Sequence, residues 1–192
     1  MNSFKQGFNC QAIGRVVIHD QATGELLLDK KNAIHPQNMA LVIARALARD
    51  DNGFISKLCF GNGGTFLNSS GQINYRSPNV IGAADLYNMT YSVQVDVQTI
   101  GTPPANSVVS LPSPTPATTA MIVVTAQLSA SEPAGQAVAD NVTTNPESLY
   151  TFDEIGLKTE DGLLLSHLVF SPVEKTANRA FLITYTLTVS VS

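Results

Sequence analysis

Residues 151–175 have the sequence TFDEIGLKTEDGLLLSHLVFSPVEK, and this stretch decides the fold. Its Asp161–Gly162 pair stands between two runs that are rich in branched and apolar residues, which is a strong signal for a β-hairpin. We therefore predict two antiparallel strands that meet at a turn over residues 160–162. Similar runs occur on both sides of this hairpin along the chain, so the same pattern indicates the class of the whole protein.

Alternating and β-branched segments predict the other strands. A single segment has a helical period instead: Pro36 suits a first helical turn, and apolar residues then recur at three- and four-residue spacing up to Leu47. We predict a helix over residues 36–49 and an antiparallel β-sandwich around it. The other predicted strand regions are 12–30 (a hairpin turning at 20–24), 54–60, 66–77 (a loop and short hairpin), 89–100, 120–130 and 180–192.

The 192 residues suit one domain, 1–192, with extended segments attached to it. We expect an N-terminal arm over 1–11, a projecting loop over 101–119 and a second loop excursion over 131–148. Proline removes backbone donors from a sheet, so a proline-rich segment favours a loop over a central strand. The prolines of the projecting loop are Pro103, Pro104, Pro112, Pro114 and Pro116.

Composition excludes several classes of function. The formal net charge is −4 and charged residues make up 14% of the chain, against about 25% in an average domain. Basic residues are scattered, so we expect no nucleic-acid partner and no anionic membrane surface. The chain contains no apolar run of roughly 18 residues and no apolar core of a secretory signal near residue 1. We therefore expect a soluble protein made in a reducing cytoplasm, with Cys10 and Cys59 as buried free thiols.

Glu154 and His167 form the one candidate acid/base pair. They lie at similar distances from the predicted turn, so the hairpin can bring them face to face. Such a pair can transfer protons, but catalysis also needs a substrate pocket and usually a nucleophile or a metal. A buried Glu more often accepts backbone hydrogen bonds or pairs with a lysine such as Lys175. We predict a structural role for the pair and no catalytic residue.

The glycine-rich segment FGNGGT, residues 60–65, has the look of a phosphate-binding loop. It lacks the lysine and the following helix that such loops require, so a tight turn with positive φ is the simpler interpretation. The histidines at 19, 35 and 167 have no metal-binding spacing. We therefore predict neither a cofactor nor a metal site.

Two blocks of sequence resemble virion structural proteins of tailed bacteriophages. The first, residues 14–65, runs from GRVVIHD through NAIHPQNM to FGNGGT; the second, residues 152–189, contains FDEIGLK, GLLL, PVEK and ITYT. The resemblance covers roughly the first third and the last quarter of the chain. The residues that carry it in the second block are Glu154, Ile155, Gly156, Leu157, Gly162, Leu163, Leu164, Pro172, Lys175, Arg179, Ile183 and Tyr185.

This resemblance implies a non-enzymatic subunit of the virion that assembles into a symmetric ring in the neck, collar or tail. Contacts would be made through sheet edges and extended arms. Partners would be further copies of the chain and other phage proteins, such as the connector, tail or major capsid protein. The expected location is the virion, after synthesis in the host cytoplasm. The candidates for structural or interaction roles are Glu154, Gly156, Gly162, His167, Lys175, Arg179 and the five prolines of the projecting loop.

Two alternatives remain open at this point. One is a capsid decoration protein that cements the shell. The other, of a different class, is a module that binds host glycans, which requires exposed aromatic side chains clustered near Asp, Asn or Arg. The tyrosines at 75, 87, 91, 150 and 185 are spread along the chain as sheet residues usually are. We therefore interpret them as core and edge residues, and we do not expect glycan binding.

Overall fold

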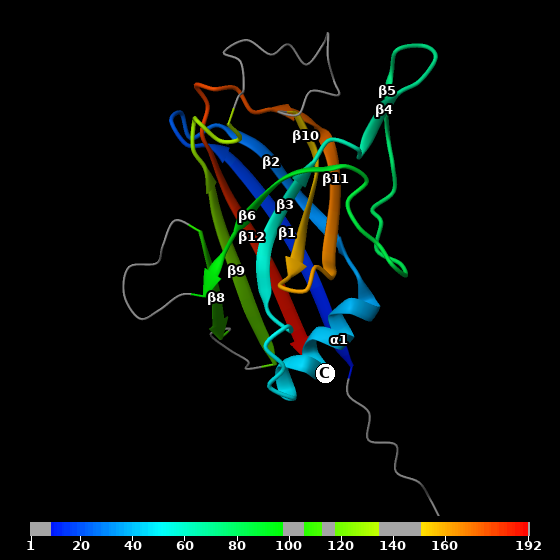
Figure 1. Cartoon of the computed structure of the whole chain (residues 1–192), viewed down its shortest axis with the longest axis vertical. Coiled ribbons are helices and arrows are strands. Elements are labelled where there is room, and N and C mark those ends of the chain that lie inside the picture. Colours follow the sequence, from blue (N-terminus) through cyan, green and yellow to red (C-terminus); the bar gives the residue numbers. More distant parts are fainter. Residues whose placement is uncertain (1–8, 98–105, 113–117, 135–150, 192) are drawn as a thin grey trace, which may run out of the picture.

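A computed structural model describes residues 9–97, 106–112, 118–134 and 151–191 of the chain (Figure 1). The described part is mainly β-structure with one helix, as predicted. The helix is α1 (Pro36–Leu47). The strands are β1 (Cys10–Asp20), β2 (Leu26–Ile34), β3 (Ile55–Gly61), β4 (Thr65–Leu67), β5 (Ile73–Tyr75), β6 (Met89–Gln94), β7 (Asp96–Val97), β8 (Ser107–Pro112), β9 (Thr119–Leu128), β10 (Thr151–Thr159), β11 (Leu164–Glu174) and β12 (Phe181–Val191).

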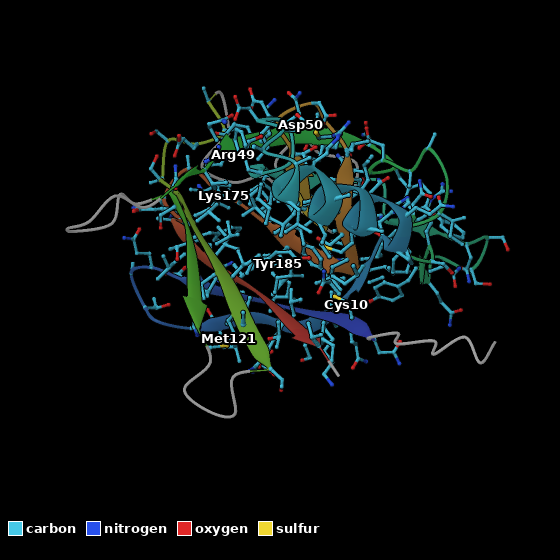
Figure 2. The ribbon with its side chains drawn as sticks, turned by 90° about the horizontal axis from the view of Figure 1, so that it is seen from below. Cys10, Arg49, Asp50, Met121, Lys175 and Tyr185 are labelled. Carbon is cyan, nitrogen blue, oxygen red and sulfur yellow. The ribbon has the colours of Figure 1, made fainter. Side chains whose placement is uncertain are left out.

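Ten strands form one sheet in the order β6-β3-β10-β11-β2-β1-β12-β9-β8-β7, and β4 and β5 pair separately. The sheet curls at β2, whose earlier residues pair with β1 while Ala33 and Ile34 pair with β11. The half containing β3, β10 and β11 therefore faces the half containing β1, β12 and β9, with side chains between them (Figures 1 and 2). The predicted sandwich is thus a single bent sheet. Neighbouring strands are antiparallel apart from β7 and β8.

The core lies between the two halves of the sheet. The Phe60 and Phe152 rings pack there with centroids 5.0 Å apart, and Tyr185 lies in the same layer (Figure 2). Seven apolar residues of the opening stretch and of the last strand are predicted to be buried, and each of them is at most 1% exposed in the structure. Six of them lie in this core: Phe152, Ile155, Leu157, Phe170, Phe181 and Ile183. Leu164 is buried in a separate cluster with Cys59 and Leu86.

The strand β10 is buried on both faces along its whole length. Its inner face packs in the core, while its outer face lies under a crossing loop that leads from β5 to β6 and places Leu86 against Cys59 and Leu164. A strand in this position carries its polar residues into a dry layer, where each needs a hydrogen-bond partner. The loop from β5 to β6 covers the outer face of the β10–β11 hairpin, and the candidate site lies between them.

Helix α1 begins after His35, whose Nδ1 accepts a hydrogen bond from the Asn38 N–H at 3.3 Å. The helix ends at Leu47, two residues before the predicted end. The last turn closes with hydrogen bonds from the Arg49 N–H to the Ala46 carbonyl and from the Asp50 N–H to the Arg45 carbonyl. Arg49 takes a left-handed conformation with φ of 60° to make this cap.

Glycine at position 49 should therefore stabilise the protein. A non-glycine residue in the left-handed region costs about 1–2 kcal/mol, so we expect Arg49→Gly to raise the free energy of unfolding by about 1 kcal/mol after the larger unfolded-state entropy of glycine is counted. Urea denaturation measures this change. The matched control is Ala44→Gly at an exposed position in the middle of the same helix, where the effect should have the opposite sign. Equal destabilisation by both changes would contradict the cap.

Two of the predicted extended segments have other boundaries in the structure. Residues 107–112, expected in a projecting loop, form β8 and pair with β9 from Ser107 to Pro112. Ser107 is buried and Val108 packs against the core, because the β-branched run SVV supports a strand despite the prolines around it. Cys10 and Gln11 belong to β1 and not to an arm. Thr119, the last residue of the predicted projecting loop, belongs to β9. Residues 1–8, 101–105, 113–117 and 135–148 of the predicted arm and loops, with Pro103, Pro104, Pro114 and Pro116, lie outside the described residues.

Candidate functional site

The glycine-rich segment that follows β3 is held by close backbone packing. A Cβ atom at Gly61 would lie 2.4 Å from the Asn88 carbonyl oxygen, and one at Gly63 would lie 2.7 Å from the Asn88 nitrogen. Neither glycine has a positive φ, so the predicted reason for them was wrong. Glycine is needed here because other backbone approaches too closely for a side chain. The close approach brings the loop N–H groups against β10.

Two carboxylates of β10 fill this loop. Asp153 accepts hydrogen bonds from the Gly64 N–H at 2.8 Å and from the Thr65 N–H at 2.8 Å. Glu154 accepts from the Gly63 N–H at 3.1 Å. Burial raises the pKa of Asp153, and the bonds from Thr65 and Gly64 oppose that rise only in part. Backbone donors that would otherwise suit a phosphate are thus occupied by the protein's own acids, which agrees with the interpretation of the segment as a turn.

Glu154 and His167 meet as predicted, although they are diagonal rather than direct neighbours, because His167 pairs with Gly156 in the register. His167 Nε2 lies 3.0 Å from Glu154 Oε2, and both side chains are fully buried. His167 Nδ1 accepts from the Asn79 N–H at 2.8 Å, so Nε2 carries the proton and donates it to Glu154. The ring is therefore neutral and the carboxylate ionised.

Glu154 also fixes the chain that precedes β6. Its Oε2 accepts from the Tyr87 N–H at 2.9 Å and its Oε1 from the Asn88 N–H at 2.7 Å. Burial by itself would raise the pKa of Glu154, but the bonds from His167, Asn88 and Tyr87 outweigh it and hold that pKa below its usual value. One side chain thus connects β10, β11, the glycine loop and the segment at 87–88. This is the geometry of a structural network, with the hydrogen-bonding capacity of the pair used inside the fold.

Arg76 lies on top of this network. Its N–H donates to the Gly64 carbonyl at 2.8 Å, and its guanidinium carbon lies 5.4 Å from the centre of the Phe66 ring and 5.1 Å from the centre of the Tyr87 ring. Tyr87 is fixed in turn by its backbone bond to Glu154 and by its hydroxyl, which donates to the Ser77 carbonyl at 2.8 Å. The buried acid therefore orients an exposed cation through one aromatic ring.

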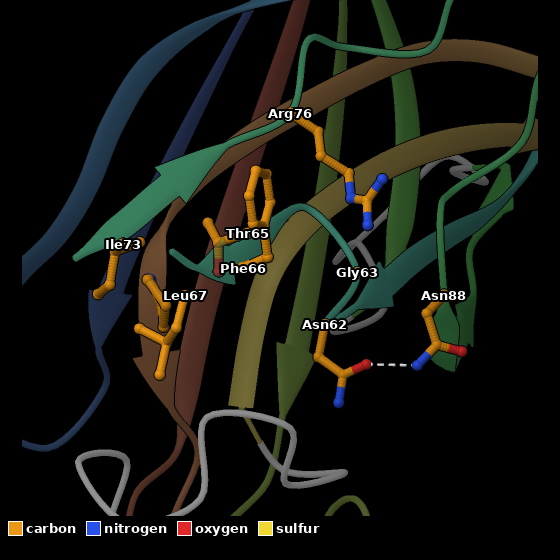
Figure 3. A pocket seen from close by; sticks show the side chains of 9 residues that line it. Asn62, Gly63, Thr65, Phe66, Leu67, Ile73, Arg76 and Asn88 are labelled. Atoms are coloured by element: carbon orange, nitrogen blue, oxygen red, sulfur yellow. Dashed lines mark hydrogen bonds between the residues drawn. The ribbon is translucent and has the colours of Figure 1, made fainter. Parts of the chain in front are cut away.

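A pocket of about 470 Å³ opens beside Arg76 (Figure 3). Its floor includes the Asn62 and Asn88 side chains, which are joined by a hydrogen bond of 2.6 Å from Asn88 Nδ2 to Asn62 Oδ1. The guanidinium points from the end of β5 towards this floor (Figure 3). The apolar part of the lining comes from Phe66, Leu67, Ile73 and Pro172, and the larger part of the lining is polar. We call this hollow the Arg76 pocket; it can hold an acidic group with apolar neighbours.

The β4–β5 hairpin that carries the pocket projects from the body of the protein (Figure 1). Its apolar side chains are unusually exposed: Phe66 by 48%, Leu67 by 51%, Ile73 by 45% and Tyr75 by 51%. The hairpin is tethered at its base by a 2.7 Å hydrogen bond between the Tyr75 and Ser171 hydroxyls. Clustered exposed apolar side chains on a rigid projection are typical of a surface that another molecule covers.

The structure brings only some predicted residues together. Glu154, His167 and Gly156 share the network, whereas Gly162 serves the β10–β11 turn with a φ of 89°. Arg179 binds Asp20 at 2.8 Å and Glu25 at 3.1 Å, which ties β12 to the β1–β2 turn. Lys175 donates weakly to the Ala130 and Thr176 carbonyls and does not reach Glu154.

Other sequence interpretations need correction as well. Cys59 is buried as expected, but Cys10 is exposed. Tyr185 is a core residue and Tyr91 is partly buried, whereas Tyr75 and Tyr87 are exposed, with Tyr87 against Arg76 and Tyr75 beside Lys30. Sequence reasoning missed Arg76, Phe66, Asn62 and Asn88 as site residues. The available signal was the two short runs with apolar residues on either side of NSSGQ, at Phe66–Leu67 and Ile73–Tyr75. Each of these runs is too short to form a buried face.

Replacement of Lys175 by methionine should stabilise the protein at neutral pH. Burial lowers the pKa of Lys175 to about 8 from 10.5, opposed in part by Glu132. Between these two pKa values, the unfolded chain binds more protons than the folded protein. The free energy of unfolding of the wild type should therefore rise with pH across about pH 8 to 10.5. We expect Lys175→Met to gain about 1 kcal/mol at pH 7 and to lose this advantage near pH 10. Thermal unfolding of both proteins across that range tests it; a constant difference at all pH values would contradict it.

Comparison of the chain with protein-family models, curated proteins and solved structures finds no match. In the described part of the chain, no group of three or more His, Cys, Asp or Glu side chains is arranged to hold a metal ion. Helix α1 is too short to cross a membrane, and it is the one helix among the described residues.

Proposed function

We propose that the protein is a non-enzymatic structural subunit of a tailed-phage virion that assembles with copies of itself into a symmetric ring in the neck, collar or tail. The sequence resemblance in residues 14–65 and 152–189 supports a place in the phage particle. The single observation that supports self-assembly is the β4–β5 hairpin, which exposes apolar side chains around a rigidly supported pocket. In a virion subunit, such an exposed apolar surface is expected where a neighbouring subunit covers it.

The buried polar network supports the same proposal. Glu154, His167 and Asp153 use their hydrogen bonds to hold the loops that carry Arg76 and the hairpin. Buried polar networks cost desolvation free energy, and they confer rigidity when every member is satisfied. A rigid projection reduces the entropy that is lost when copies associate, which favours a specific interface.

Oligomeric state in solution tests the proposal. We expect the purified chain to form one discrete oligomer in light scattering, and the double variant Leu67→Ser with Ile73→Ser to weaken it at least tenfold. Leu26→Ser is the matched control, because Leu26 is 55% exposed but lies on β2 outside the hairpin. Unchanged circular dichroism would show that each variant is folded. A chain that stays monomeric at high concentration and does not bind purified particles would overturn the proposal.

Cryo-electron microscopy of intact particles separates the possible positions. Density for the chain in a ring at the head–tail junction or along the tail supports the proposed place. Density over the capsid lattice identifies the alternative, a decoration protein.

A glycan-binding module is the second candidate, and one observation favours it. The structure gathers Phe66 and Tyr87 at Arg76, and Asn62 and Asn88 line the same pocket, which is the kind of cluster that such a module needs. It ranks second because the guanidinium lies over the Phe66 and Tyr87 rings, where a sugar would stack. Saturable binding to host polysaccharide that is lost in Tyr87→Ala would favour the glycan module.

A further inference from the structure

We propose that the Arg76 pocket receives the opposite end of a second copy of this chain, with Glu160 of that copy binding the Arg76 guanidinium. This inference rests on the proposed self-assembly and names its interface. The interface is head-to-tail: each copy offers a basic pocket with apolar side chains at one end and an acidic projection at the other.

The first step is the state of Arg76. Within the part of the chain that the structure describes, Arg76 has no acidic partner, and its contacts are the two aromatic rings and its backbone bond to Gly64. Contact with aromatic rings does not use the N–H donors of a guanidinium, and these donors match the two oxygens of a carboxylate. Several other cations are already paired; these pairs are Arg15–Asp29, Arg45–Asp161, Lys158–Asp85 and Arg179–Asp20.

The second step is the acidic end. Arg45 binds Asp161 at 2.6 Å and Asp50 at 3.6 Å, which joins the β10–β11 turn to the end of helix α1. This acidic end carries four carboxylates, at Asp50, Asp51, Glu160 and Asp161, and the arginines of the same segments are Arg45 and Arg49. Among the described contacts, Glu160 and Asp51 have no ion pair.

The acidic end also carries apolar side chains that match the apolar part of the pocket lining. Leu47, the last residue of α1, is 83% exposed, and Phe54 is 43% exposed just before β3. Carboxylates beside exposed apolar side chains complement a guanidinium beside Phe66, Leu67 and Ile73. Glu160 is the acid that enters the pocket in this proposal, because it is exposed in the β10–β11 turn and has no ion pair among the described contacts, whereas its neighbour Asp161 is bound to Arg45.

The third step is geometry. The β4–β5 hairpin lies at one end of the molecule, and α1 with the β10–β11 turn lies at the other (Figure 1). A single copy cannot bring its own Glu160 to its own Arg76 because the rigid strands β10 and β11 separate them. The contact is therefore between copies and uses two different surfaces. Such heterologous contacts generate closed rings when the rotation between copies closes, which is the symmetry of the proposed assembly.

Charge reversal tests the contact. We expect Arg76→Glu and Glu160→Arg each to weaken association of the full chain about tenfold or more, as measured by sedimentation velocity over a range of concentrations. An equimolar mixture of the two variants should assemble again, because each junction then joins opposite charges. Lys31→Glu is the control for Arg76→Glu, since it makes the same change at another exposed basic residue. Arg76→Lys should fall between wild type and Arg76→Glu, because lysine keeps the charge and loses the planar guanidinium.

The outcomes separate this inference from the function on which it rests. If wild type assembles and both reversals assemble equally well, the inference is overturned while self-assembly stands. If only Arg76→Glu fails to assemble, the pocket binds something other than Glu160, and the inference is again overturned. If wild type itself is monomeric, the proposed function fails first. Loss in each single variant with recovery in the mixture supports the head-to-tail interface.

Discussion

Glu154→Ala should reduce the free energy of unfolding by about 3–5 kcal/mol, which is the usual cost of removing one partner from a buried charged network. The change leaves the N–H groups of Gly63, Tyr87 and Asn88 and the Nε2–H of His167 without their acceptor. The bond from His167 is fully buried, and the three bonds from the backbone N–H groups are partly buried. Urea denaturation measures the loss as a shift in midpoint at constant slope.

Two variants sharpen this prediction. Glu154→Gln keeps the shape and one acceptor oxygen, so its loss should be smaller than that of the alanine variant. Glu160→Ala removes a carboxylate from an exposed turn six residues away in sequence and should change stability by no more than about 0.5 kcal/mol. A loss at Glu160 that matched the loss at Glu154 would contradict the buried network as the cause.

The same network predicts the response to acid. Because the folded-state pKa of Glu154 lies below its usual 4.5, its stabilisation is complete above that pH and is lost as the pH falls through the lower folded value. Asp153 has the opposite sign, since its folded pKa is raised and its protonation opposes the loss. The free energy of unfolding of the wild type should therefore fall less steeply with decreasing pH than the contribution of Glu154 alone would predict. An Asp153→Asn variant, which cannot titrate there, should unfold more steeply with acid.

Phe60→Ala should cost about 3–5 kcal/mol through lost burial and the cavity that remains. Phe60 is fully buried and packs against Phe152 between the halves of the sheet, so no neighbour can move in without breaking strand pairing. The loss of this ring contact adds to the loss of buried area. Thermal unfolding should show the variant melting well below wild type.

Phe66→Ala is the matched control for Phe60→Ala, because the chemical change is identical and Phe66 is 48% exposed on the β4–β5 hairpin. Its stability should change by about 0.5 kcal/mol or less in the monomer, while association of copies should weaken. The two phenylalanines thus separate folding from assembly. A stability loss at Phe66 equal to that at Phe60 would mean that the hairpin is part of the folding core.

Much of the fold follows from local pattern. The Asp161–Gly162 turn and the branched and apolar runs on both sides of it predict β10 and β11, and the large apolar residues of these runs, such as Phe152, Ile155 and Phe170, are the ones expected to be buried. The meeting of Glu154 with His167 is also predictable, because a tight turn fixes which residues of a hairpin face each other. Local sequence contains the information for contacts that are local in the chain.

The rest depends on contacts between distant segments. Arg76 could not be identified from sequence because its role arises from Tyr87 and from a loop held by β10. Strand β8 could not be predicted from local sequence, because the prolines near it favour a loop. Its short β-branched run forms a strand by pairing with β9. Lys175 is buried without a carboxylate partner among its described hydrogen bonds. No local sequence pattern predicts this burial.

The glycine loop after β3 has a consequence for when the protein becomes able to associate. Its N–H groups bond to side chains 91 and 89 residues further along the chain, at Glu154 and Asp153. A chain still emerging from the ribosome has β3, β4 and β5 long before it has β10, so the loop and Arg76 have no support at that stage. The surface for neighbours is therefore completed only when the last third of the chain has folded. In the proposed assembly, association would therefore follow the synthesis of β10, and an unfinished subunit would lack the interface.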